Sequence, residues 1–338
     1  MSVSLPTKSR APRKTYTDIV GLELGADTAA GVPAVRLRKR EGQTELLAAG
    51  FLNLPGKLPE TPGPDGAKRT IWSLPREFQA PHAALAVSSS FAFLRHSTGA
   101  VDDATEKKQF AYRQASLITA PDLPPFVIGL PEFQSVWAAQ LLPEGCRPTA
   151  CSLQVSAAAA LSGFMATPSF ASTGGNAVVL VVFPEHTALA AFQETRLVLY
   201  REHPVGTRHL QNAISAQMGI EVALADTVLE DNLIDPLPII DPVLRPLFRQ
   251  VEISADYLLR RRNCPVEHFF TCGLAAGSRY WAKVFAHMMN QSLTFCSPLD
   301  GIQTVEKPSG LPKEKDLAGV APFLMSAIGA ARAVLEDV

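Results

Sequence analysis

The chain has 338 residues, of which 47% are hydrophobic and 19% charged, the composition of a soluble globular protein of roughly two domains. Its formal net charge of −1 gives no general attraction for polyanions, so nucleic acid is not expected as a partner. No uninterrupted run of about 18 apolar residues occurs, and a transmembrane helix is therefore not predicted.

The first 17 residues form a basic segment. They carry Lys8, Arg10, Arg13 and Lys14 and no acidic residue. A segment of this composition cannot bury a core, so residues 1–17 are predicted to be a disordered basic arm. Such an arm is usually a solubilising tail. The alternative is a peripheral membrane contact, because basic residues near anionic headgroups gain about 1 kcal/mol each.

Three short segments then predict a β-meander. Residues 18–24, 34–39 and 45–54 are rich in apolar and β-branched residues, and a tight turn at 41–43 separates the last two. The stretch 55–66 is rich in proline and glycine, so it is predicted to be an exposed loop.

The middle of the chain predicts a strand at 83–87 and a helix at 131–142. The segment 149–164 begins as a strand and passes into an alanine-rich helix. Small residues on that helix would allow close packing against a sheet.

A second meander follows at 178–202. Its strands 178–183, 187–193 and 196–202 lead into a helix at 208–218, for which Gly219 is a stop signal. Two copies of one unit suggest an internal duplication with a cleft between the halves. Coincidence is the alternative, because meanders are common.

The remaining segments predict a mainly helical C-terminal third. Asp241-Pro242 is expected to open the longest helix, which ends at the basic run 260–262. A strand at 268–272 enters a glycine-bearing loop, and Ser278 is expected to cap the next helix, an arrangement typical of phosphate sites but also of any strand–helix connection. A strand at 293–296 and a helix at 320–335 complete the chain.

This order of elements resembles the duplicated ribonuclease-H-like fold of the actin-like ATPases. Within that superfamily the chain is most similar to the branch of the type IV pilus protein PilM and the cell-division protein FtsA. The resemblance covers about 18–335 and is carried by four phrases: AVVLVVFPEHTALAAFQETRLVLYREHPVG, VEHFFTCGLAAGSRYW, LTFCSPLDGI and APFLMSAIGAARAV.

The resemblance implies an α/β fold of two ribonuclease-H-like subdomains with a smaller inserted lobe. The first subdomain is expected at 18–87, with 320–338 packing back on it. The inserted lobe is expected at 88–163 and the second subdomain at 164–319.

The nucleotide motifs of the superfamily are altered in this chain. Residues 23–27, ELGAD, stand where the family has Asp-x-Gly-Ser/Thr, and Val182 stands where it has a second acid. Pro184 replaces the glycine of the second phosphate turn, and a proline has no N–H to offer a phosphate. In the adenosine loop Gly273 is kept, but Leu274 replaces the second glycine.

The resemblance therefore implies a degenerate nucleotide site without a catalytic residue. Its predicted members are Glu23, Gly25, Ala26, Asp27, Glu185, Gly206, Gly273, Leu274 and Gly277. The five cysteines contain no C-x-x-C pair, and no metal site is predicted from them.

Two functions follow from the resemblance. The first is a PilM-like cytoplasmic scaffold, peripheral to the inner membrane, in a type IV pilus or type II secretion-like assembly platform, without ATP hydrolysis. Its implied partner is the cytoplasmic tail of a PilN-like bitopic membrane protein, held on the inserted lobe by Phe126, Phe133 and Trp137. The alternative is an ATPase of the PilM/FtsA type that binds ATP and Mg²⁺ through Glu23 and Asp27, with Glu185 replacing the lost acid. Self-association into a homo-oligomer is compatible with both.

Overall fold

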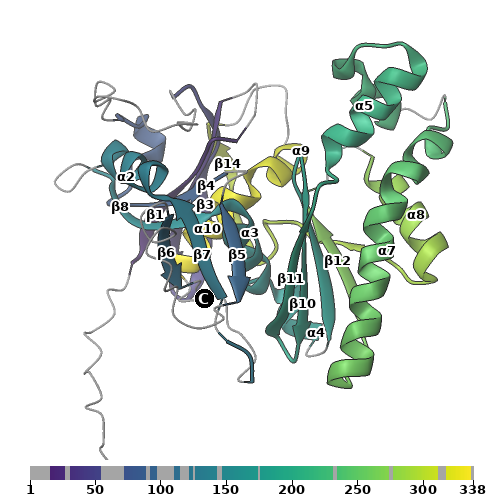
Figure 1. Ribbon diagram of the computed structural model, residues 1–338. Coiled ribbons are helices and arrows are strands. Elements are labelled where there is room, and N and C mark those ends of the chain that lie inside the picture. Colours follow the sequence, from purple (N-terminus) through teal and green to yellow (C-terminus); the bar gives the residue numbers. More distant parts are fainter. Residues whose placement is uncertain are drawn as a thin grey trace, which may run out of the picture.

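The computed structural model describes the elements of two large sheets, a small third sheet and the helices around them (Figure 1). The described residues are 16–26, 31–54, 72–88, 92–96, 110–114, 122–124, 126–142, 147–173, 176–230, 234–273, 277–310 and 317–335. The predicted basic arm, except its last two residues, and the predicted loop 55–66 lie outside them.

The first sheet has six strands in the order β14-β3-β2-β1-β4-β8. Its first meander is confirmed, and the β2–β3 turn places Glu41 and Gly42 at positive φ. The strand bounds are β1 Asp18–Leu24, β2 Val32–Arg40, β3 Gln43–Leu52, β4 His82–Val87, β8 Thr149–Val155 and β14 Ile302–Ser309.

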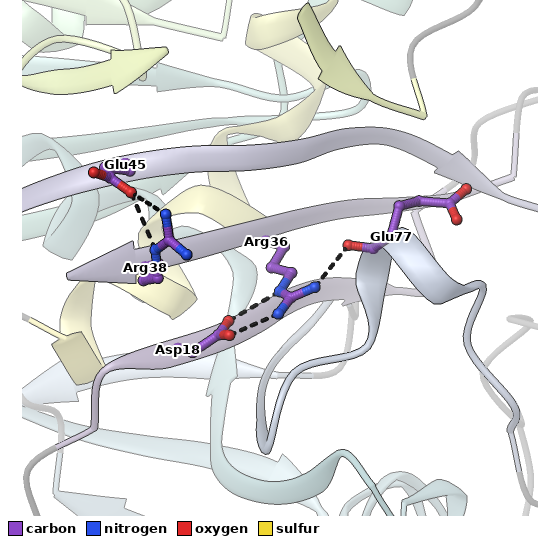
Figure 2. A network of polar contacts seen from close by, with 5 residues as sticks. All are labelled: Asp18, Arg36, Arg38, Glu45 and Glu77. Carbon is purple, nitrogen blue, oxygen red and sulfur yellow. Dashed lines mark hydrogen bonds and ion pairs between the residues drawn. The ribbon is translucent and has the colours of Figure 1, made fainter. Parts of the chain in front are cut away.

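One face of this sheet carries a polar network that Figure 2 shows from close by. Arg36 donates two hydrogen bonds to Asp18, at 3.0 and 2.7 Å, and a third to the carbonyl oxygen of Glu77 at 3.3 Å. Arg38 donates to one carboxylate oxygen of Glu45 at 3.1 and 2.6 Å. These partly exposed pairs join β1, β2 and β3 but contribute little to stability. The buried side chains of the opposite face contribute more.

Strand β14 was not predicted. It follows the elements of the second sheet in the chain, yet it pairs in parallel with β3 at the edge of the first sheet. The assignment of 164–319 to the second subdomain is therefore wrong for the residues of β14. Its sequence, IQTVEKPS, lacks an apolar pattern because an edge strand is held by backbone hydrogen bonds to one neighbour.

Among the described residues, the inserted lobe consists of a three-stranded antiparallel sheet, β5-β7-β6, and helix α2. In the chain it lies between β4 and β8, so its elements end before 149, whereas the lobe was predicted to extend to 163. Strand β8 pairs with β4 in the first sheet, because its apolar residues continue that core. The lobe elements are β5 Phe93–His96, β6 Phe110–Gln114, β7 Phe126–Pro131 and α2 Glu132–Leu141.

The second sheet has five strands in the order β11-β10-β9-β12-β13. The second meander is confirmed, and β9 pairs in parallel with β12 as β1 does with β4, which repeats the same unit in both halves. Its bounds are β9 Ala177–Val182, β10 Thr187–Gln193, β11 Arg196–His203, β12 His268–Cys272 and β13 Thr294–Phe295.

Helices after the second meander form the outer part of this half. Helix α5 ends at Gly219, which takes the left-handed conformation predicted for a stop signal. Helices α7 and α8 pack their apolar residues on the outer face of the second sheet (Figure 1). The bounds are α5 Thr207–Met218, η2 Val222–Leu224, α6 Ala225–Glu230, α7 Leu237–Arg262 and α8 Ser278–Met289.

The start of α7 differs from the prediction. Asp241 does not cap the helix; the Asp235 carboxylate instead accepts a hydrogen bond from the Leu237 amide at 3.1 Å. Pro242 and Pro246 lie inside the helix on its exposed side, where solvent can satisfy the carbonyl oxygens that lose an N–H partner. The cap of α8 is likewise Gly277 rather than Ser278, because the turn needs a φ of 74°.

Helices α3 and α10 lie between the two sheets (Figure 1) and pack backbone against backbone. A Cβ added at Gly329 of α10 would lie 1.9 Å from the Ala159 oxygen of α3, and one added at Gly163 would lie 2.8 Å from the Cα of Gly329. The same helix touches β1, where a Cβ at Gly21 would lie 2.0 Å from the Ala327 oxygen. The bounds are α3 Ser156–Met165, α4 Pro168–Thr173, α9 Leu317–Val320, η3 Ala321–Leu324 and α10 Met325–Leu335.

The helical stretch 317–335 is long and apolar enough to cross a membrane by composition alone. Its residues are instead largely buried in the core between α3 and the first sheet. Arg332 in this stretch is 2% exposed and donates to the carbonyl oxygens of Asp300, at 2.9 Å, and Ala166. Its buried guanidinium thereby joins the end of α3 to the turn before β14.

Candidate functional site

The first predicted phosphate turn leads to a buried carboxyl group. Glu23, at the end of β1, is 6% exposed, and burial raises the pKa of its carboxyl from 4.5 to about 7. The hydroxyls of Ser156 in α3 and Ser326 in α10 lie close enough to lower that pKa in part. Burial is the larger effect, so the pKa stays well above its usual value. The three side chains form a buried polar cluster, called the Glu23 cluster below.

The turn after Glu23 is only partly described. Gly25 has a φ of 73°, which favours glycine, and both Gly25 and Ala26 are half-buried. Asp27 lies outside the described residues. The structure therefore places one of the two predicted acids, Glu23, and does so in the interior.

The second predicted phosphate turn, between β9 and β10, contacts the start of α5. The amides of Thr207 and Arg208 donate to the carbonyl oxygens of Phe183 and Pro184 at 3.2 and 2.9 Å. A Cβ at Gly206 would lie 2.3 Å from the Phe183 oxygen, so this glycine serves the contact with the turn. The first amides of a helix usually attract anions, but here two of them already have partners.

Glu185 lies on the surface of the same turn. Its carboxylate is 2.8 Å from the Arg208 guanidinium, and its side chain is 57% exposed. An exposed carboxylate that pairs with an arginine does not fit the predicted role of the missing second acid. Among the residues that the structure describes, no group of three His, Cys, Asp or Glu side chains could hold a metal ion.

The third predicted motif is the loop between β12 and α8. Gly273 has a φ of 89°, and a Cβ there would lie 2.3 Å from the Val182 oxygen and 2.8 Å from the Met325 methyl group. Gly277 similarly packs beside Leu229. Leu274 lies outside the described residues. The space beside Gly273 is thus occupied by β9 and by the first residue of α10.

A small cavity lies next to this loop, between α3, α10 and β12. Its volume is about 10 Å³, the size of one water molecule. Cys272, Cys296 and Met325 contribute sulfur atoms to a largely apolar lining that also includes Phe164 and Thr167. A cavity of this size cannot hold an adenine ring.

Three contributors to these contacts were not predicted from the sequence: Ser156, Ser326 and Met325. Each lies in the first turn of a helix. The phrases VSAAAA and LMSAIG contain these two helix starts. Their meeting with Glu23 and Gly273 depends on the packing of α10 between the two sheets, which spacing alone does not reveal.

The predicted partner-binding residues of the lobe differ in exposure. Phe126 is 1% exposed, and its ring meets that of Tyr200 in β11 edge to face with centroids 6.4 Å apart. Its assignment as a partner anchor is therefore wrong, because the second sheet already covers it. Phe133 and Trp137 are half-buried on α2, and Val136 between them is 48% exposed.

Comparisons with known proteins give matches by structure alone. No protein-family model and no curated protein matches the chain. A chain of a solved PilM-PilN type IV pilus biogenesis complex matches with a TM-score of 0.64 and 16% identity, over 96% of this chain and 99% of that chain. A Bacteroides thetaiotaomicron protein of unknown function with an actin-like ATPase fold has a TM-score of 0.44 and 8% identity, over 84% and 92%. The archaeal actin homolog Ta0583 has a TM-score of 0.44 and 13% identity, over 95% and 100%.

The match to the pilus complex extends over nearly the whole of both chains. Together with the repeated meander and the lobe inserted between β4 and β8, it confirms the predicted fold class. The chain has the duplicated ribonuclease-H-like fold of the actin-like ATPases and is similar to the matched chain of the PilM-PilN complex.

Proposed function

We propose that the chain is a PilM-like scaffold of a type IV pilus or related assembly platform, which acts by holding a partner protein rather than by hydrolysing ATP. The observation that carries the proposal is the whole-length structural match to a chain of the PilM-PilN complex. In this proposal the protein is cytoplasmic, lies next to the inner membrane, and binds the tail of a PilN-like membrane protein.

The contacts at the three predicted nucleotide motifs support a scaffold rather than an ATPase. Two amides at the start of α5 donate to the β9–β10 turn, and Met325 occupies the space beside Gly273. Glu23, the one predicted acid that the structure places in the interior, is buried, and its raised pKa disfavours the charge that a metal ion would need. A nucleotide would have to displace contacts that the chain makes with itself.

A thermal melt with and without Mg-ATP tests whether the protein binds nucleotide. We expect no change in the melting temperature on addition of millimolar Mg-ATP. A ligand present at 100 times its Kd would add about 2.7 kcal/mol to the free energy of unfolding. A rise that requires both ATP and Mg²⁺ and disappears in Glu23→Gln would support the alternative, the ATPase of the PilM/FtsA type. The position of Glu23 at the end of β1 is the observation that keeps that alternative.

The lobe helix α2 is the proposed partner-binding surface. Phe133 and Trp137 are half-buried and Val136 is exposed, so these neighbours present apolar area next to the lobe core. Apolar and aromatic residues of this kind are typical anchors in a protein interface.

Replacing Phe133 by Ala is expected to weaken binding of the PilN-like tail peptide by about 1–3 kcal/mol, since an interface anchor loses that much on truncation. Fluorescence anisotropy with a labelled peptide measures the change. Leu224→Ala, which truncates a 52% exposed side chain on η2, is the control and should bind as the unaltered protein does. Equal binding by Phe133→Ala, with the fold intact by circular dichroism, would place the partner elsewhere.

A further inference from the structure

The lobe is connected through the chain only to the first sheet, yet it touches the second half through a charged contact. Asp122, which precedes β7, accepts two hydrogen bonds from Arg262 at the end of α7, each 2.9 Å long. The Nε atom of Arg262 donates to the Gln193 side chain at 3.0 Å. Two nitrogen atoms of the guanidinium therefore hold the lobe to the end of α7, and the third joins the end of α7 to β10.

Apolar contacts continue from the same point. Leu123 packs against the core of the second half, and Phe126 is buried against Tyr200 of β11. Three residues within five positions of the lobe thus contact the other half: Asp122 at α7, Phe126 at β11 and Leu123 at its apolar core. Figure 1 shows the lobe strands beside β11, in agreement with these contacts.

We propose that Asp122, Leu123 and Phe126 form a clasp that fixes the inserted lobe to the second half, so that the lobe and the angle between the two large sheets change together. The lobe leaves the first sheet after β4 and returns at β8, so its attachment to that sheet is covalent at both ends. The clasp adds a separate connection across the molecule. A movement of the lobe relative to the first sheet would then also move the second half.

The two partners of the ion pair differ in exposure. The Arg262 side chain is 15% exposed and is held by Gln193, whereas the Asp122 side chain is 62% exposed. Opening the ion pair would release Asp122 to solvent, but it would leave the largely buried Arg262 with its hydrogen bond to Gln193 and without its counterion, which favours the closed contact. Arg262 also stands at the C-terminal end of α7, where the helix dipole favours a positive charge.

The clasp would couple partner binding on α2 to the arrangement of the two large sheets if the proposed function is correct. Its existence does not depend on that function, and the test uses the full chain without partner or nucleotide. Hydrogen–deuterium exchange of β7 and β11 is compared in Asp122→Ala, Arg262→Ala and the double variant. Arg38→Ala, which breaks the Arg38–Glu45 contact within one sheet (Figure 2), is the matched control.

Each single variant is expected to raise exchange in β7 and β11 by roughly two- to fivefold, as for loss of an exposed ion pair. The double variant should match Arg262→Ala, because Asp122→Ala removes a contact that Arg262→Ala has already removed, and the Arg38 control should leave β7 and β11 unchanged. Unchanged exchange in the single variants, or a double effect equal to the product of the two, would overturn the clasp. If the exchange results are as expected but the unaltered protein does not bind the PilN-like peptide, the proposed function is wrong and the clasp is not.

Discussion

Gly329→Ala is expected to lower the free energy of unfolding by at least about 3 kcal/mol, the largest effect foreseen for a single methyl group in this chain. The new Cβ would lie 1.9 Å from the Ala159 oxygen and 2.5 Å from the Ala159 carbonyl carbon. Both are backbone atoms of α3, so no side-chain rotation can relieve the overlap. Helices α3 and α10 would have to separate.

The sign of this effect distinguishes packing from helix propensity. In an exposed helix, alanine stabilises by about 1 kcal/mol relative to glycine. Urea unfolding followed by circular dichroism would therefore show stabilisation if α3 and α10 were not in contact. Gly219→Ala is the control: nothing lies within 4 Å of its added Cβ, so only its left-handed backbone opposes the change, at about 1 kcal/mol.

Glu23→Gln is expected to stabilise the protein by about 3 kcal/mol at pH 8 and to change little at pH 4. Burial raises the pKa of the carboxyl from 4.5 to about 7, so the folded state holds a proton that the unfolded state releases between these values. Stability of the unaltered protein therefore falls as pH rises, by about 1.4 kcal/mol per pH unit across that window, and is level above it. Glutamine cannot ionise and removes this slope.

Urea unfolding at several pH values between 4 and 8 measures the difference between the two proteins. Glu45→Gln, which removes the surface partner of Arg38, is the control and should lower stability slightly at neutral pH. Parallel pH profiles for Glu23→Gln and the unaltered protein would show that the Glu23 carboxyl is ionised inside the fold. In that case the Glu23 cluster would have to contain a compensating cation.

The two meanders were predictable because local signals determine them. Apolar β-branched runs alternate with short turns, and the turn residues Glu41, Glu194 and Thr195 all take positive φ. Strand β14 was not predictable in the same way. Its polar sequence gains its partner only when β3, more than 250 residues earlier, is already in place.

The site was predicted in part for a similar reason. The resemblance identified Glu23 and Gly273, but neither position reveals that Met325 and Ser326 approach them from the other end of the chain. Phe126 was misjudged because an aromatic residue in a small lobe was expected to lack cover. Tyr200 supplies that cover from the second half, and a contact between halves leaves no trace in local spacing.

The place of α10 also has a consequence for biosynthesis. Ile19, Val35 and Leu37 in the first strands are buried by α10, which begins at Met325. At ribosomal rates of about 5–20 residues per second, roughly 15–60 s pass between the synthesis of β1 and β2 and that of α10. The nascent first sheet therefore exposes an apolar surface for almost the whole of translation. Chaperones that bind nascent chains should bind it, and truncation before α10 should yield aggregated rather than half-folded protein.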